Sequence, residues 1–193
     1  MNLVEPLLID IPERLEGQRC VLLAPRAGLG AELAVVITQS LSHLRPWMPW
    51  AQEAPSAASS ELVVRRMQAD FIARRDLCFQ IYARRADGSA GRLLGGTGLH
   101  RIDWTVRKFE IGYWLRPEAA GQGHASEAVR LLSALAFERL AARRVEIRCD
   151  ALNVKSRAVA ERCGFVLEGV LRHDALGVDG APRDTAVYSR IAG

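Results

Sequence analysis

Two glycines, Gly121 and Gly123, stand between a strand-like run and the start of an amphipathic helix, in the segment RPEAAGQGHASEA of residues 116–128. Because glycine has no Cβ, a backbone built from it can approach a ligand closely. The helix that follows begins with backbone N–H groups that lack an intrahelical acceptor, and with the positive end of its dipole. This combination predicts an anion site, and a phosphate-bearing cofactor would bind here.

The spacing of this loop differs from the two common nucleotide-binding loops. No Gly-Lys-Ser/Thr sequence ends it, which excludes a P-loop. The dinucleotide fingerprint Gly-x-Gly-x-x-Gly also fails, because Ser126 occupies the third glycine position. A tight turn between a strand and a helix explains two glycines equally well, so the loop alone leaves both interpretations open.

The periodicity of apolar residues predicts one mixed α/β domain around this loop, with residues 1–15 as a flexible N-terminal arm. Strands are expected at 18–24, 78–83, 93–102, 109–115, 145–151, 165–171 and 185–191, and helices at 31–41, from Ser59 or Ser60 to 75, at 124–140 and at 153–163. This order predicts a central, twisted, mostly antiparallel sheet of about six to seven strands, flanked by about four helices.

Composition and charge exclude several classes of protein. Of the 193 residues, 49% are hydrophobic and 25% are charged, and the absence of a long apolar run predicts a globular protein rather than a membrane protein. The start of the chain carries Glu5 and Asp10 where a signal peptide would be basic, so a cytoplasmic location is expected. The net charge of +4 comes mostly from dispersed arginine pairs, which argues against a nucleic-acid surface.

The four cysteines are scattered, at Cys20, Cys78, Cys149 and Cys163. They show no C-x-x-C spacing and no neighbouring histidine pair. This pattern argues against a zinc site and against a disulfide framework, so no metal is expected.

Three segments resemble the GNAT N-acetyltransferases in their order and separation, and the N-terminal half resembles the RimJ/RimL-like branch of that family. They are FEIGYWLRPEAAGQGHASEA, IRCDALNVKSRAVAERCGFVLEGVLR and RDTAVYSRI, and LRPWMPWA precedes them near the front of the chain. The resemblance covers most of the chain. It implies the GNAT fold, acetyl-CoA as the cofactor, and transfer of the acetyl group to an amine by direct attack.

The resemblance places the cofactor along the strand and the glycine loop. The family loop pattern Gln/Arg-x-x-Gly-x-Gly/Ala falls on Glu118, Gly121 and Gly123, and Glu118 departs from it because the usual residue is basic or an amide. The implied pyrophosphate cradle consists of the backbone N–H groups of Gln122, Gly123, His124, Ala125 and Ser126. The implied partners of the pantetheine amides are the backbone groups of Tyr113, Trp114 and Leu115. The amide of Leu115 or a neighbour is also a candidate donor to the reaction oxyanion.

Asn153 and Ser156 mark the second part of the implied site. An asparagine before a helix is predicted to be its N-cap, and the resemblance adds a contact with the pantetheine arm. In RimL-like enzymes the serine at the position of Ser156 lies near the CoA sulfur and can protonate the leaving thiolate. Many other members use a tyrosine four residues later, where this chain has Ala160. Ser156 or a water is therefore expected to be the acid.

The general base is less clearly marked. An amine is mostly protonated at neutral pH, so a carboxylate or histidine beside it would assist transfer. Glu110, on the strand that leads to the loop, is the first candidate, and a solvated strand residue is the alternative interpretation. His100 and Asp174 are further candidates. The glutamate that RimL-like enzymes carry on the strand after the serine helix has no counterpart, because its place falls on Ala175.

Three tryptophans are candidate substrate-binding residues. Trp47 and Trp50 lie in a breaker-rich segment between two helices, where they either close the core or line the mouth of the acceptor site. Trp104, in a turn between strands, is the other candidate wall.

These observations predict an acetyl-CoA-dependent N-acetyltransferase that acts on a primary amine. A protein N-terminal α-amine of the ribosomal-protein type is the first-choice acceptor, and a small amine such as an amino acid, polyamine or antibiotic is the alternative. A non-catalytic acetyl-CoA-binding module is the alternative from another class of function. The expected partners are acetyl-CoA and the amine acceptor, without a membrane, and exposed strands leave a homodimer open.

Overall fold

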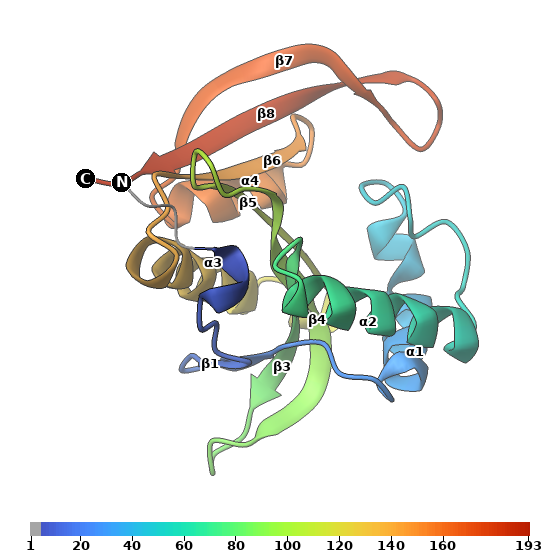
Figure 1. The fold of residues 1–193 in the computed structure, drawn as a ribbon. Coiled ribbons are helices and arrows are strands. Elements are labelled where there is room, and N and C mark those ends of the chain that lie inside the picture. Colours follow the sequence, from blue (N-terminus) through green and yellow to red (C-terminus); the bar gives the residue numbers. More distant parts are fainter. Residues whose placement is uncertain (1–4) are drawn as a thin grey trace.

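A computed structural model describes residues 5–193 of the chain (Figure 1). One eight-stranded sheet runs through it in the order β1-β2-β3-β4-β5-β6-β8-β7. Its strands are β1 (Arg14–Glu16), β2 (Cys20–Leu23), β3 (Leu77–Arg84), β4 (Ala90–Asp103), β5 (Lys108–Leu115), β6 (Arg144–Asp150), β7 (Val166–Leu176) and β8 (Pro182–Ile191). The α-helices of this range are α1 (Gly30–Leu44), α2 (Ala57–Ile72), α3 (His124–Ala134) and α4 (Val154–Arg162).

The predicted fold class, a mixed α/β domain with a mostly antiparallel sheet, is confirmed. The prediction of about six to seven strands was too low, because β1 has only three residues, two of them charged, and shows no apolar alternation. The predicted start of α2 was also late. Ser56, rather than Ser59 or Ser60, is the N-cap, and its side chain accepts a hydrogen bond from the backbone N–H of Ser59.

The N-terminal segment packs against the domain where it is described. Residues 1–4 of the predicted arm lie outside the described residues. Further along this segment, Ile11 is only 4% exposed within the core, and the carbonyl of Ile9 accepts a hydrogen bond from Arg74. Within residues 5–193, no helix is long and apolar enough to cross a membrane.

Neighbouring strands pair antiparallel throughout the sheet except at β5 and β6, which are parallel. These two strands pair only where residues 108–110 face residues 144–146. Beyond that point β5 stays paired with β4 as far as Leu115, while β6 stays paired with β8 as far as Asp150. The two strands therefore diverge after Glu110, and within the described residues the edge of β5 that faces β6 has no strand partner from 111 to 115.

Both faces of the sheet carry a core, because successive side chains of a strand point to opposite faces. On one face, Phe109 and Ile111 of β5 belong to a buried cluster with Leu132 of α3 and with residues of α4. On the other face, Tyr82 of β3 packs with Val64 of α2 and with residues of α1. Alternate side chains of β5 thus face either α3 and α4 or α1 and α2.

Candidate functional site

The loop between β5 and α3 adopts the left-handed conformations that its glycines permit. The φ angle is +75° at Gly121 and +85° at Gly123, values that strain other residues. A Cβ at Gly121 would meet no atom within 4 Å, so this side of the loop is open. Gly123 is the N-cap of α3, and no side chain caps this helix end. The first intrahelical hydrogen bond is donated by Glu127, which leaves the backbone N–H groups of residues 123–126 available for an anion.

The polar side chains of the loop are engaged within the loop itself. The Gln122 amide donates to the backbone carbonyl of Glu118 at 2.5 Å. The Glu118 carboxylate lies 2.8 Å from the Arg116 guanidinium, which holds the pKa of Glu118 below its usual range. The departure of Glu118 from the family pattern therefore places no unpaired negative charge at the helix end. The groups left for an anion at this helix end are backbone N–H groups.

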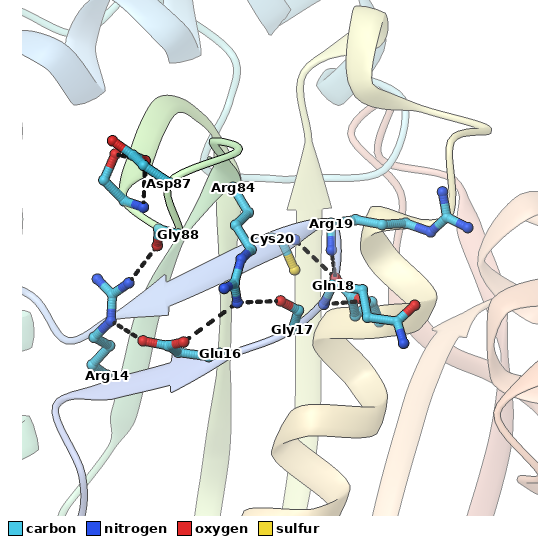
Figure 2. Close-up of polar contacts among 11 residues, drawn as sticks. Arg14, Glu16, Gly17, Gln18, Arg19, Cys20, Arg84, Asp87 and Gly88 are labelled. Atoms are coloured by element: carbon cyan, nitrogen blue, oxygen red, sulfur yellow. Dashed lines mark hydrogen bonds and ion pairs between the residues drawn. The ribbon is translucent and has the colours of Figure 1, made fainter.

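Hydrogen bonds connect the turn between β1 and β2 to the first turn of α3 (Figure 2). The Glu127 carboxylate accepts hydrogen bonds from the backbone N–H groups of Gln18, Arg19 and Cys20, at 2.9, 2.8 and 2.8 Å. Burial raises the pKa of Glu127, but these hydrogen bonds together outweigh it, so its pKa lies below the usual range. The carboxylate therefore stays ionised and holds the turn in place.

Arg19, in this turn, places a guanidinium beside the N-terminus of α3. The Nε atom of Arg19 lies 3.5 Å from the position that a Cβ of Gly123 would occupy, and its side chain extends away from the strand pair (Figure 2). A guanidinium beside an uncapped helix N-terminus adds to the positive potential there and can pair with phosphate oxygens. Sequence reasoning missed Arg19, because it lies more than 100 residues before the loop that it contacts.

Ser156 lies at the first turn of α4, beside the diverging edge of β5. The predicted N-cap role of Asn153 is confirmed, because its side-chain oxygen accepts from the Ser156 backbone N–H at 3.1 Å. The Tyr113 hydroxyl reaches from β5 to this turn, where its oxygen lies 2.8 Å from Ser156 Oγ and 3.0 Å from the Ser156 carbonyl oxygen. Burial raises the pKa of Tyr113, so this hydroxyl keeps its proton.

The sequence prediction concerned only the backbone of Tyr113 and did not identify its hydroxyl as a partner of Ser156. Ala160, at the place where many family members carry a tyrosine, is fully buried in the core. A phenolic hydroxyl is thus present beside Ser156, but it comes from the strand instead of the helix.

Glu110 lies on the opposite face of the sheet, at the last pair before β5 and β6 diverge. Its side chain is 17% exposed, and among residues 5–193 its buried Oε2 has no hydrogen-bond partner, with Arg101 Nη1 at 3.5 Å. Burial raises the pKa of Glu110, although Arg101, Arg148 and His100 oppose this effect. A carboxylate whose pKa is raised toward the operating pH is suited to accept a proton from an amine.

The other two candidate bases differ in their surroundings. His100 lies directly opposite Glu110 in the pairing of β4 with β5, so the structure brings these two together. The carboxylate of Asp174, on β7, forms an ion pair with the Arg148 guanidinium at 2.8 Å.

The three tryptophans do not form one wall. Trp50 is 52% exposed and Trp47 is 37% exposed, so neither closes the core. The ring of Trp50 meets that of Trp114 edge to face, at 5.7 Å between centroids. Trp104 packs on Phe109 and donates its indole N–H to the Arg74 carbonyl. Since Phe109 and Trp114 are about 17 Å apart along β5, Trp104 lies far from the other two.

The arrangement suits a ligand with a phosphate end and an amide-bearing arm. The N-terminus of α3 with Arg19 can hold the anion, and the free edge of β5 can pair with amide groups that enter between β5 and β6. At the inner end of this path, Ser156 lies on one face of the sheet and Glu110 on the other. A hydroxyl and a carboxylate thus flank the point where the strands diverge.

Comparisons with known proteins agree with this arrangement. A family model described as an acetyltransferase (GNAT) domain matches residues 26–166. YdaF of Bacillus subtilis (strain 168), named as a candidate ribosomal N-acetyltransferase, is 40% identical over 165 residues, which cover 82% of this chain and 84% of that protein. The ribosomal-protein-serine acetyltransferase of Escherichia coli (strain K12) is 37% identical over 99 residues, covering 51% of this chain and 55% of that protein.

Solved structures share the fold over nearly the whole chain. The microcin C7 self-immunity acetyltransferase MccE, in complex with acetyl-CoA and AMP, superposes with a TM-score of 0.85 at 26% identity, covering 94% of this chain and 98% of that chain. RimL, a ribosomal L7/L12 α-N-protein acetyltransferase in complex with coenzyme A, gives a TM-score of 0.85 at 23% identity, covering 93% of this chain and 98% of that chain. The expected GNAT fold is confirmed.

Proposed function

This chain belongs to the GNAT acetyltransferase family, and we propose that it transfers the acetyl group of acetyl-CoA to the α-amine of a protein N-terminus. The observation that carries this proposal is the divergence of β5 from β6 beside an uncapped helix N-terminus, with Glu110 and Ser156 on either side. An acceptor of the ribosomal-protein type is supported by two relatives, the candidate ribosomal N-acetyltransferase YdaF and the ribosomal-protein-serine acetyltransferase of Escherichia coli.

The residues around the divergence fit acetyl-CoA. The backbone N–H groups of residues 123–126, with the guanidinium of Arg19, would hold its pyrophosphate. The free edge of β5 at Tyr113, Trp114 and Leu115 would pair with its pantetheine amides, and the side chain of Asn153, which caps α4, would contact the pantetheine arm. When bound, acetyl-CoA supplies the acetyl group as a thioester that an amine can attack.

In this proposal the side chains of the protein move the protons. Glu110 accepts a proton from the acceptor nitrogen, and burial raises its pKa, which makes the carboxylate a better proton acceptor. Ser156 donates a proton to the departing sulfur. The Tyr113 hydroxyl, 2.8 Å from Ser156 Oγ, fixes the serine rotamer. Trp47 and Trp50, both exposed, would line the entry of the acceptor.

Transfer to defined amines tests this proposal. The enzyme is mixed with acetyl-CoA and, in separate reactions, a peptide with a free N-terminal serine, the same peptide with a blocked N-terminus and a free lysine, and a polyamine. We expect thiol release only with the free N-terminus, and tandem mass spectrometry should locate the acetyl group on the α-amine. Acetylation of the polyamine alone would support the small-amine alternative. Binding of acetyl-CoA without transfer to any amine would support a non-catalytic module.

A further inference from the structure

His100 occupies the same face of the sheet as Glu110, on the neighbouring strand. The two residues are directly paired between β4 and β5, which places their Cβ atoms about 5 Å apart. Their side chains face the side of the sheet that carries α1 and α2, together with Trp114 two pairs further along. His100 is therefore a second titratable group beside the proposed acceptor nitrogen.

Asp76, the residue before β3, contacts one nitrogen of the His100 ring. His100 Nδ1 lies 2.8 Å from Asp76 Oδ2, and the Cys78 thiol donates to the other oxygen of the same carboxylate at 3.0 Å. Burial raises the pKa of the Cys78 thiol, so the sulfur keeps its proton and remains a donor. An ionised Asp76 can only accept, which places the proton of a neutral His100 on Nδ1 and leaves a lone pair on Nε2.

Two glycines make room for the free edge of this ring. A Cβ on Gly98 would lie 2.8 Å from Cε1 and 3.0 Å from Nε2 of His100. A Cβ on Gly112 would lie 2.9 Å from Cδ2 and 3.1 Å from Nε2. The ring can occupy this position only because both residues are glycine. Among residues 5–193, no protein group forms a hydrogen bond with Nε2, and the His100 side chain is 32% exposed.

From this geometry we propose that His100 is a second catalytic residue, which takes the first proton from the acceptor ammonium, and that Asp76 is its positioning residue. The inference rests on the proposed acetyl transfer. The nitrogen of an ammonium loses two protons on becoming an amide, while the sulfur gains one. His100 Nε2 accepts the proton that must leave before the nitrogen can attack, Glu110 accepts the proton that leaves afterwards, and Ser156 supplies the proton to sulfur. One proton is released to solvent in each turnover.

Charged groups from several elements face this pair. Asp76 immediately precedes β3 and Cys78 lies on it, Asp70 of α2 acts on Cys78, and Arg101 of β4 pairs with Glu110. Arg148 and Glu146 of β6 also act on Glu110. The carboxylates of Asp76 and Glu110 flank the imidazole and offset the guanidinium charges of Arg101 and Arg148, so proton acceptors are present where an ammonium would arrive.

Acceptors that differ in protonation separate the two roles. An α-amine, with a pKa of 7.7–8.0, is only about one-tenth neutral at pH 7, so an enzyme that must wait for the neutral form loses about tenfold in kcat/KM. We expect His100→Gln to lower kcat/KM about tenfold with an N-terminal serine peptide at pH 7. The same variant should leave kcat/KM almost unchanged with an alkoxyamine or aniline acceptor, which is already neutral. Glu110→Gln should impair both kinds of acceptor.

A variant of Asp76 tests the orientation of the His100 ring. Asp76→Asn can donate to Nδ1 and move the proton to Nε2, so it should reproduce the selective loss of His100→Gln, and ¹⁵N NMR should show the changed tautomer. The matched control Asp87→Asn makes the same change at an exposed aspartate in the turn between β3 and β4 and should change neither. Equal losses with ammonium and neutral acceptors, or no loss with either, would overturn this inference while leaving the acetyl transfer of the wild-type protein intact. An inactive wild-type protein would overturn the proposed function itself.

Discussion

The cation beside the glycine loop gives a quantitative prediction for cofactor affinity. Arg19 Nε lies at the N-cap of α3, and the backbone of Arg19 is fixed by the ionised Glu127. A hydrogen bond to a charged group contributes about 1.5–3 kcal/mol, and an exposed side chain lies at or below the lower limit of that range. Arg19→Gln should therefore cost about 1.4 kcal/mol, which raises the Kd for acetyl-CoA about tenfold.

Isothermal titration calorimetry with two ligands separates this effect from general damage. Arg19→Gln should weaken binding of acetyl-CoA but not of acetyl-pantetheine, which lacks the phosphates. The difference from the wild-type protein should also shrink as salt is added, because exposed charges are screened. The control Arg26→Gln makes the same charge change at a side chain that is 75% exposed and pairs with Glu13, and it should leave both affinities unchanged.

The reasoning would be refuted by equal losses with the two ligands, or by the same loss in the Arg26 variant. Either result would mean that the guanidinium does not meet a phosphate. An unchanged Kd for acetyl-CoA would show that the backbone cradle holds the anion without Arg19.

Three further predictions concern the proton path and the anchoring of the loop. Glu110→Gln should lower kcat about 100-fold without changing the Kd for acetyl-CoA, and stopped-flow kinetics should show that it removes the contribution of Glu110 to the acid limb of the wild-type pH profile. The contribution of Glu110 should lie above pH 4.5, because its raised pKa leaves the carboxyl mostly protonated at pH 4.5. Ser156→Ala should lower kcat about 100-fold and Tyr113→Phe about fivefold, the latter for one lost hydrogen bond; equal KM values for acetyl-CoA would place both effects on the chemical step. Glu127→Gln should lower the free energy of unfolding by about 2 kcal/mol at pH 7. In urea titrations that difference should be complete above pH 4.5 and vanish as pH falls through the lowered folded-state pKa of Glu127.

Local signals in the sequence were sufficient to predict the parts of the site that depend on neighbouring residues. Gly121 and Gly123 require positive φ where the strand turns into the helix, and Asn153 caps the helix that it precedes. Both properties belong to a few consecutive residues. The strand predicted at 109–115 likewise corresponds to β5, in which Phe109, Ile111 and Leu115 are buried.

The remaining parts depend on contacts between distant segments, for which the sequence carries no local pattern. The bond from Gln18 to Glu127 joins residues 109 positions apart, and the bond from Tyr113 to Ser156 joins residues 43 positions apart. Asp76 and His100 meet only because β3 pairs with β4. Trp104 likewise depends on distant segments, since its indole N–H donates to the Arg74 carbonyl 30 residues earlier.

The most direct test of the central claim is the fate of the acetyl group in a single reaction with a peptide that carries a free N-terminal serine. Thiol release and intact-peptide mass are followed together, with the wild-type protein and with Glu110→Gln at equal concentration. We predict one thiol released for each acetyl group found on the α-amine, at a rate about 100-fold lower in the variant. Tight binding of acetyl-CoA by both proteins, with no acetylated peptide from either, would contradict the account.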